Sequence, residues 1–246
     1  MSTSQFEEEL DIKKMIFLAK ACVQTYKQFK YDGKLIVPGG YSLVQVFKAK
    51  VLRVFEWFGY IIESENDAII AFRGSLSRRD WITDLGVAQT NYQFAPNAGK
   101  VHRGFYHIYS SCRDNILNTL EGMSPHLKIY ITGHSLGGGL AVLNALDVAV
   151  NTKHKNPIML NFGAPRTGNY DFASVYNRLV KNSIRVVNDM DIAPKNPNRV
   201  TLSPIFNKFW VYKHVNYPYT ISFQAGGAMA NHDIRNYLKQ LEKQVK

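Results

Sequence analysis

The order of apolar segments along the chain predicts an α/β fold, with a mixed, mostly parallel central sheet covered by helices on both faces. Two observations support this prediction. From about residue 105 onward, short β-branched and aromatic segments alternate with longer segments of helical periodicity. Before them, two strand-like segments joined by a polar turn add an antiparallel hairpin. A chain of 246 residues suits one domain of this kind, spanning residues 1–246.

The first part of the chain is predicted to hold a helix, a hairpin and a second helix. Apolar residues at helical spacing predict the first helix over 6–29. Strands are expected at 51–62 and 68–72, with the polar turn 63–67 between them. An amphipathic helix follows over about 105–120.

The second part of the chain alternates strands with helices. The segment 136–150 is apolar on nearly every face, as expected of a helix packed deep against a sheet. A last helix is predicted over 233–245. Further strands are expected at 158–162, 184–188, 210–215 and 219–223.

Charge and hydropathy restrict the class of protein. The formal charge is +11, but Lys and Arg are scattered rather than gathered in one stripe, so we expect no nucleic-acid partner. A general attraction to anionic lipid surfaces fits the charge equally well. No apolar run reaches the ~20 residues of a membrane span. Glu7, Glu8 and Glu9 precede any apolar stretch, which argues against a secretory signal. We expect a cytoplasmic protein, with a secreted mature form as the open alternative.

The two cysteines, Cys22 and Cys112, each lie at an apolar position of a predicted helix. We expect two buried free thiols, and one disulfide remains the alternative. Cys and His residues show no metal-ligand spacing, so neither a metal nor an organic cofactor is expected.

The segment 127–138 carries the strongest chemical signal. It reads as a strand, a Gly-x-Ser-x-Gly turn and a helix, which is the context of a nucleophile elbow. Gly133 and Gly137 lack a Cβ, so the chain can reverse sharply and present the Ser135 hydroxyl. The amide of Leu136 opens the following helix, where unpaired N–H groups favour an anion. The turn therefore predicts a nucleophile and half of an oxyanion hole.

A serine nucleophile of this kind needs a base and an acid, which follow it in the order Asp or Glu, then His. His232, in the loop before the last helix, is the best base. His134 is expected to have a structural role, and His214 to be a satisfied core histidine. Asp189 and Asp191 both follow the strand 184–188, and spacing alone does not separate them.

Several segments in a fixed order resemble one family. They are 71–85, 101–105, the elbow at 133–138, and 162–169, which reads Phe-Gly-Ala-Pro-Arg-Thr-Gly-Asn. From about residue 17 to 238, the chain resembles the class 3 lipases, the fungal-lipase-like group of the α/β hydrolases. The resemblance implies Ser135 as nucleophile, Asp191 rather than Asp189 as acid, and His232, shortly before Tyr-Leu, as base.

The resemblance also implies a second oxyanion donor and a lid. Ser75 matches the oxyanion-hole residue, beside the Leu136 amide. Residues 76–87 match the lid helix, in which Asp84 steadies that serine and Trp81 stands among apolar and charged residues. Such a helix can cover a cleft in water and turn onto a lipid surface. A plain surface helix with Trp81 as its buried anchor is the alternative.

The function that the resemblance implies is hydrolysis of acylglycerol esters, of triacylglycerols or partial glycerides, through an acyl-enzyme on Ser135. Phospholipase A1 or short-chain esterase activity is the alternative, and a non-catalytic lipid-binding or signalling module is a remote one. Expected partners are a lipid or other ester substrate and a transient lipid interface. The chain lacks the several cysteines typical of secreted fungal members, which suggests a bacterial or intracellular relative.

Overall fold

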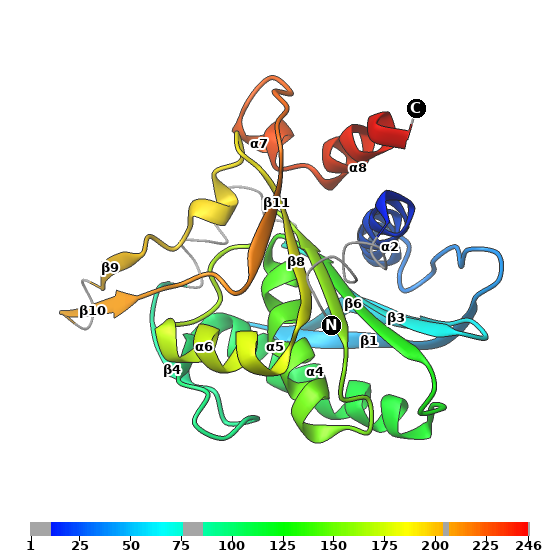
Figure 1. The fold of residues 1–246 in the computed structure, drawn as a ribbon, viewed down its shortest axis with the longest axis horizontal. Helices are drawn as coiled ribbons and strands as arrows, with labels where there is room; N and C mark the ends of the chain where they lie inside the picture. Colours follow the sequence, from blue (N-terminus) through cyan, green and yellow to red (C-terminus); the bar gives the residue numbers. More distant parts are fainter. Residues whose placement is uncertain (1–10, 76–85, 204–206, 246) are drawn as a thin grey trace.

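The computed structural model describes residues 11–75, 86–203 and 207–245. Within these ranges seven strands form one central sheet (Figure 1). In spatial order they are β1 (Ser42–Val51), β2 (Val54–Glu63), β3 (Asp67–Phe72), β6 (Lys128–His134), β7 (Ile158–Phe162), β8 (Asn182–Asn188) and β11 (Tyr217–Ile221). Strands β1, β2 and β3 pair antiparallel, and β3 to β11 pair in parallel. The predicted mixed, mostly parallel sheet is confirmed.

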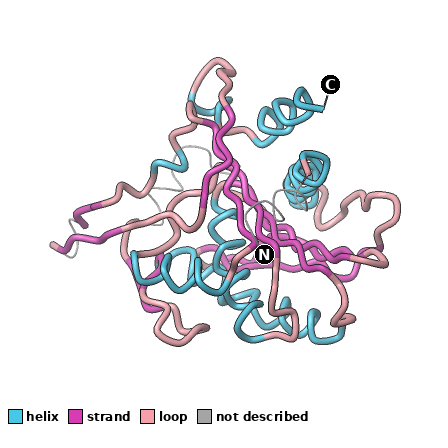
Figure 2. Tube along the Cα trace, viewed as in Figure 1, coloured by secondary structure: helices cyan, strands magenta, loops and turns pink. Residues whose placement is uncertain are grey.

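Helices cover both faces of this sheet (Figures 1 and 2). One face packs against α4 (Arg103–Gly122), α5 (Leu136–Asn151) and α6 (Tyr170–Leu179), and the other against α2 (Ile12–Lys30) and α8 (Ile234–Glu242). Successive strand residues point to opposite faces. In β6, Ile129 and Ile131 therefore join the α4–α5 core, while Tyr130 joins the α2–α8 core.

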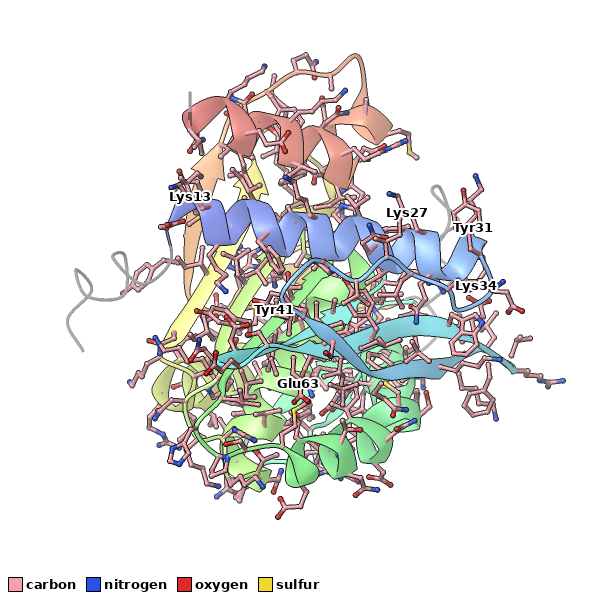
Figure 3. All side chains as sticks on the ribbon, turned by 90° about the vertical axis from the view of Figure 1, so that its right-hand side faces the viewer. Lys13, Lys27, Tyr31, Lys34, Tyr41 and Glu63 are labelled. Atoms are coloured by element: carbon pink, nitrogen blue, oxygen red, sulfur yellow. The ribbon has the colours of Figure 1, made fainter. Side chains whose placement is uncertain are left out.

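The two central helices form for different local reasons. In α5 every residue from Leu136 to Val148 is buried, which agrees with its predicted apolar character on all sides. Helix α2 is amphipathic and is capped at its N-terminus by Asp11, whose carboxylate accepts the amide of Lys14 at 2.9 Å. Figure 3 shows α2 running across the front of the view, with Lys13 near one end of the helix and Lys27 and Tyr31 near the other.

The strand predicted at 51–62 is wrong at its start. The chain turns at Leu52, whose φ is +56°, and two antiparallel strands, β1 and β2, meet there. Strand β1 lies at the sheet edge, and its sequence alternates apolar and polar residues over 44–46 and again over 47–51. A register shift between Phe47 and Lys48 breaks this alternation in two.

The strand predicted at 210–215 is also displaced. Strand β10 (Lys208–Val211) pairs with β9 (Val200–Ser203) in a separate two-stranded sheet, outside the central one. A second small sheet joins β4 (Gln89–Asn91) to β5 (Lys100–His102).

The remaining short elements lie after β8. They are the 3-10 turns Ala193–Lys195 and Lys243–Val245 and the helix α7 (Ala228–Asn231). Helix α6, which periodicity did not reveal, is capped by Asn169, whose side chain accepts the amide of Phe172 at 2.9 Å.

Cys22 and Cys112 are buried free thiols, as expected. In the described part of the chain, no helix has the length and apolarity to cross a bilayer.

Candidate active site

Ser135 occupies the turn between β6 and α5. Its φ of +58° and ψ of −128° are sparsely populated for a residue with a side chain, so the turn is strained. The Ser135 amide donates to the Phe162 carbonyl at 2.9 Å, which joins the turn to β7. The turn requires close backbone approach: a Cβ on Gly133 would lie 2.8 Å from the Gly138 nitrogen. Local backbone packing therefore presents the Ser135 hydroxyl at the end of the strand.

Three side chains distant in sequence meet in one hydrogen-bonded row. The Nε2 atom of His232 lies 2.7 Å from the Ser135 hydroxyl oxygen. The Nδ1 atom of His232 lies 2.7 Å from Asp191 Oδ2. Asp189 is exposed at the same loop, whereas Asp191 is fully buried. Tertiary structure thus brings Asp191, not Asp189, to the imidazole, in agreement with the choice that the resemblance implied.

The Asp191 carboxylate is held from both sides. Its Oδ1 accepts the amide of Ala193 at 2.9 Å, in the turn that follows β8. Its Oδ2 accepts the hydroxyl of Tyr237, on α8, at 2.7 Å. The same hydroxyl accepts the amide of Asn188 at 3.0 Å. These contacts satisfy a buried charge that would otherwise be costly, and they leave Oδ2 aligned with His232.

The backbone of His232 is supported by His134, the residue before the nucleophile. Nε2 of His134 lies 2.7 Å from the carbonyl oxygen of His232. A carbonyl only accepts, so Nε2 carries the proton, and Nδ1 accepts the Tyr26 hydroxyl at 2.7 Å. Burial, and then the neighbouring His232, lower the pKa of His134 well below its usual value. His134 is therefore a neutral link between α2 and the candidate base.

Gly163, in the turn after β7, makes room for the candidate acid and base. Its φ is +56°, and a Cβ there would lie 2.9 Å from Asp191 Oδ2 and 3.2 Å from the His232 ring. A side chain at this position would displace the hydrogen-bonded row. The Gly-Ala-Pro-Arg segment noted in the sequence thus has a direct steric role at the site.

A pocket of about 530 Å³ opens beside Ser135 and His232. Its apolar wall includes Val23 and Phe29 of α2, Met229 of α7 and Ile234 of α8. Its cationic side chains are Lys27, Lys30 and Arg235, of which Arg235 is ion-paired with Asp233, and Asp233 and Ser75 also line it. The pocket therefore combines an apolar wall with positive charge near the serine.

The two candidate oxyanion donors both lie close to the nucleophile. Leu136 is the first residue of α5, directly after Ser135. The segment before Ser75 approaches from β3, since a Cβ on Gly74 would lie 3.1 Å from that of Ser135. Trp81 and Asp84, and with them most of the candidate lid 76–87, fall outside the described residues.

Sequence reasoning did not assign Tyr26, Tyr237 or Gly163 to the site. Tyr26 lies within the helix predicted over 6–29, and Tyr237 belongs to the Tyr-Leu pair that follows His232. The hydroxyls of the two tyrosines were the signal in the sequence that could have pointed to a role at the site, because a buried tyrosine hydroxyl normally has a hydrogen-bond partner. His214, expected to be a satisfied core histidine, does bond through Nε2 to the Pro194 carbonyl at 2.7 Å.

The sequence is similar to lipid-hydrolysing enzymes of known function. A Phospholipase A1-Igamma1, chloroplastic, of Arabidopsis thaliana is 31% identical over 183 residues, which cover 57% of this chain and 36% of that protein. A lipase of Rhizomucor miehei is 37% identical over 145 residues, covering 55% and 39%. The chain thus spans little more than a third of the length of these curated relatives.

Solved structures share the fold. A triacylglycerol lipase whose catalytic centre is described as a serine protease triad superposes with a TM-score of 0.70 at 25% identity, over 89% of this chain and 82% of that one. The predicted α/β-hydrolase fold is thereby confirmed. Residues 69–201, more than half of the sequence, match the family described as Lipase (class 3). The chain belongs to the class 3 lipase family.

Proposed function

We propose that this protein is a serine hydrolase that cleaves carboxylic esters of lipids through an acyl-enzyme on Ser135. The observation that carries the proposal is the continuous row from Ser135 through His232 to Asp191, with both contacts at 2.7 Å. This row faces a pocket with an apolar wall of the kind that takes an acyl chain.

In the proposed mechanism His232 accepts the Ser135 proton at Nε2 as the hydroxyl oxygen attacks the ester carbonyl. The Asp191 carboxylate accepts a hydrogen bond from the Nδ1–H group of His232. This bond fixes the tautomer of the imidazole, and the charge of Asp191 stabilises the imidazolium that forms. The oxyanion is stabilised by the Leu136 amide, at the N-terminus of α5, and by Ser75. The alcohol leaves with the proton from His232, and water hydrolyses the acyl-enzyme by the same steps.

Acylglycerols are the proposed substrates. The wall formed by Val23, Phe29, Met229 and Ile234 suits a hydrocarbon chain, and the Rhizomucor miehei relative is a lipase. Transient contact with a lipid interface is part of this proposal, because such substrates are presented at one.

Phospholipase A1 activity is the second candidate, supported by one feature of the pocket. Lys27 and Lys30 line it and would attract a phosphodiester, whereas Arg235 is ion-paired with Asp233. The Arabidopsis thaliana relative is a phospholipase A1.

Replacing the nucleophile tests the reaction class. Ser135→Ala is expected to abolish turnover of a p-nitrophenyl acyl ester and labelling by a fluorophosphonate, while circular dichroism shows an intact fold. Ser174→Ala, at an exposed position of α6, is the matched control and should retain full activity and labelling. Equal turnover by both variants would refute the proposal, and a non-catalytic lipid-binding protein would not be labelled at all.

A panel of esters tests the substrate class. Dioctanoylglycerol, dioctanoyl phosphatidylcholine and dioctanoyl phosphatidylglycerol share their acyl chains and differ in head group. We expect the glyceride to be cleaved with the highest kcat/KM. A preference for phosphatidylglycerol that falls in Lys27→Gln/Lys30→Gln would instead establish the phospholipase candidate. A preference for water-soluble short-chain esters would refute both.

A further inference from the structure

A second cavity, of about 340 Å³, is lined by a cluster of positive side chains. Arg166, Arg185, Arg199 and Lys213 contribute four cations, beside Tyr170 and His214. None of these residues lines the pocket at Ser135. The proposed hydrolysis makes no use of this cavity.

The fold brings these cations together from separate segments. Arg166 follows β7, Arg185 lies within β8, and Arg199 and Lys213 flank the small sheet of β9 and β10. No carboxylate lines the cavity, and among the described residues none of the four takes part in an ion pair. Like charges gathered without a counter-charge repel one another, so the site is electrostatically incomplete.

Backbone carbonyls fix the two inner guanidinium groups in place. Nη1 of Arg166 donates to the carbonyls of Lys195 and Pro197, the latter at 2.8 Å. Nε of Arg185 donates to the Val215 carbonyl at 2.7 Å. Only 7% of Arg185 is exposed. These bonds orient the guanidinium groups but leave their full charges uncompensated. The site is therefore organised in advance of any ligand.

The protonation behaviour of the cluster agrees with this arrangement. Burial and the neighbouring Arg166 lower the pKa of Arg185 to about 10. Burial, followed by the charge of Arg199, lowers the pKa of Arg166. A bound anion would offset this repulsion. Because the pKa of Arg185 stays far above neutrality, its guanidinium group carries its charge at pH 7.

We propose that this cavity binds a phosphate group. Guanidinium groups bind phosphate oxygens in bidentate pairs, and a tetrahedral dianion can face several donors at once. Four cations around one cavity exceed what a single carboxylate would require. Arg185 is buried and Arg166 half-buried, whereas Arg199 and Lys213 are exposed and accessible to a ligand from solution.

The phosphate group could arrive free in solution or on a lipid. Arg199 and Lys213 adjoin the β9–β10 sheet, one face of which exposes apolar side chains paired across the strands. These are Val200, Leu202, Phe209 and Val211. Both sources present the same chemistry to the cavity, so the experiment includes one arm for each.

The first arm is isothermal titration of the full chain with inorganic phosphate at low ionic strength, in Ser135→Ala so that both arms use one protein. We expect one site per chain. Arg199→Gln/Lys213→Gln should weaken binding at least about tenfold, which corresponds to about 1.4 kcal/mol. Arg53→Gln/Lys50→Gln, at the turn between β1 and β2 on the opposite sheet edge, removes the same charge and should leave binding unchanged. Arg185→Lys keeps the buried charge but not the fork, and should also bind more weakly.

The second arm uses vesicles of phosphatidylcholine with and without phosphatidic acid, whose head group is a phosphate monoester. Binding to phosphatidic acid vesicles that falls in Arg199→Gln/Lys213→Gln, but not in Arg53→Gln/Lys50→Gln, identifies a lipid source. Binding of inorganic phosphate alone identifies a free source. Failure of both ligands to bind, or an equal loss in the two double variants, would overturn the proposal. Ester turnover plays no part in either readout.

Discussion

Acidification is expected to destabilise this fold through the buried His102 and His134 and the half-buried His214. Burial lowers the pKa of His102 to about 4 and that of His214 to about 3, and it lowers the pKa of His134 well below its usual value. His102 and His134 each bond through Nε2 to a backbone carbonyl, of Gly86 and His232 respectively. All three are neutral in the folded protein at pH 5, where an unfolded chain would protonate them.

The sign and size of the effect follow from that difference. An ordinary histidine titrates near a pKa of about 6.5, so the unfolded chain binds more protons below that pH. Stability therefore falls as the pH drops from about 6.5 toward the folded pKa values of about 4 and 3. Between pH 7 and 5 each such histidine costs about 2 kcal/mol, or about 4 kcal/mol for His102 and His214 together. His134 adds to the loss. A domain has only about 5–15 kcal/mol to lose.

Urea unfolding at pH 7, 6 and 5, followed by tryptophan fluorescence, measures this loss. His102→Asn is the informative variant, because Nδ1 of His102 caps α4 by accepting the Gly104 amide at 3.1 Å, and asparagine caps helices without titrating. Its loss between pH 7 and 5 should be about 2 kcal/mol smaller than that of the parent. The exposed His126→Asn is the control and should change nothing. An identical pH dependence for His102→Asn and the parent would refute the reasoning.

Three substitutions test the hydrogen bonds around the candidate base. Asp191→Asn removes the charge that stabilises the His232 imidazolium, so kcat for a soluble ester should fall by about three orders of magnitude or more with little change in urea stability; retained activity would contradict the proposed role. Tyr237→Phe removes a donor to the Asp191 carboxylate and should lower the free energy of unfolding by about 2–4 kcal/mol, measured by urea titration. Tyr26→Phe leaves Nδ1 of His134 without its donor and should cost about 1–3 kcal/mol in the same assay, whereas no loss would place that hydroxyl outside the network.

Local pattern was sufficient for much of the fold and for the nucleophile. The strand Ile158–Phe162 has the predicted bounds, and α5 begins at the predicted residue. The glycines around Ser135 indicated a sharp turn, because such a turn brings backbone segments close together over a few residues and leaves no room for a Cβ. The prediction failed at 51–62, where one turn at Leu52 separates two strands, and at the displaced strand β10. Both failures fall in local hairpins, β1–β2 and β9–β10, where the position of the turn, not a partner distant in sequence, sets the bounds of the strands.

Sequence by itself determined most of the elements, the turn that carries Ser135 and the order in which an acid and a base follow it, because periodicity and turn chemistry act over a few residues. Tertiary structure alone decided which groups meet. Spacing left Asp189 and Asp191 open and the family resemblance favoured Asp191, but only the structure shows its burial and its bond to the Tyr237 hydroxyl, 46 positions away. His134 was linked to His232 across 98 positions. The four cations of the second cavity are scattered in sequence, and they form one site only because the sheet and the β9–β10 strands bring their segments together.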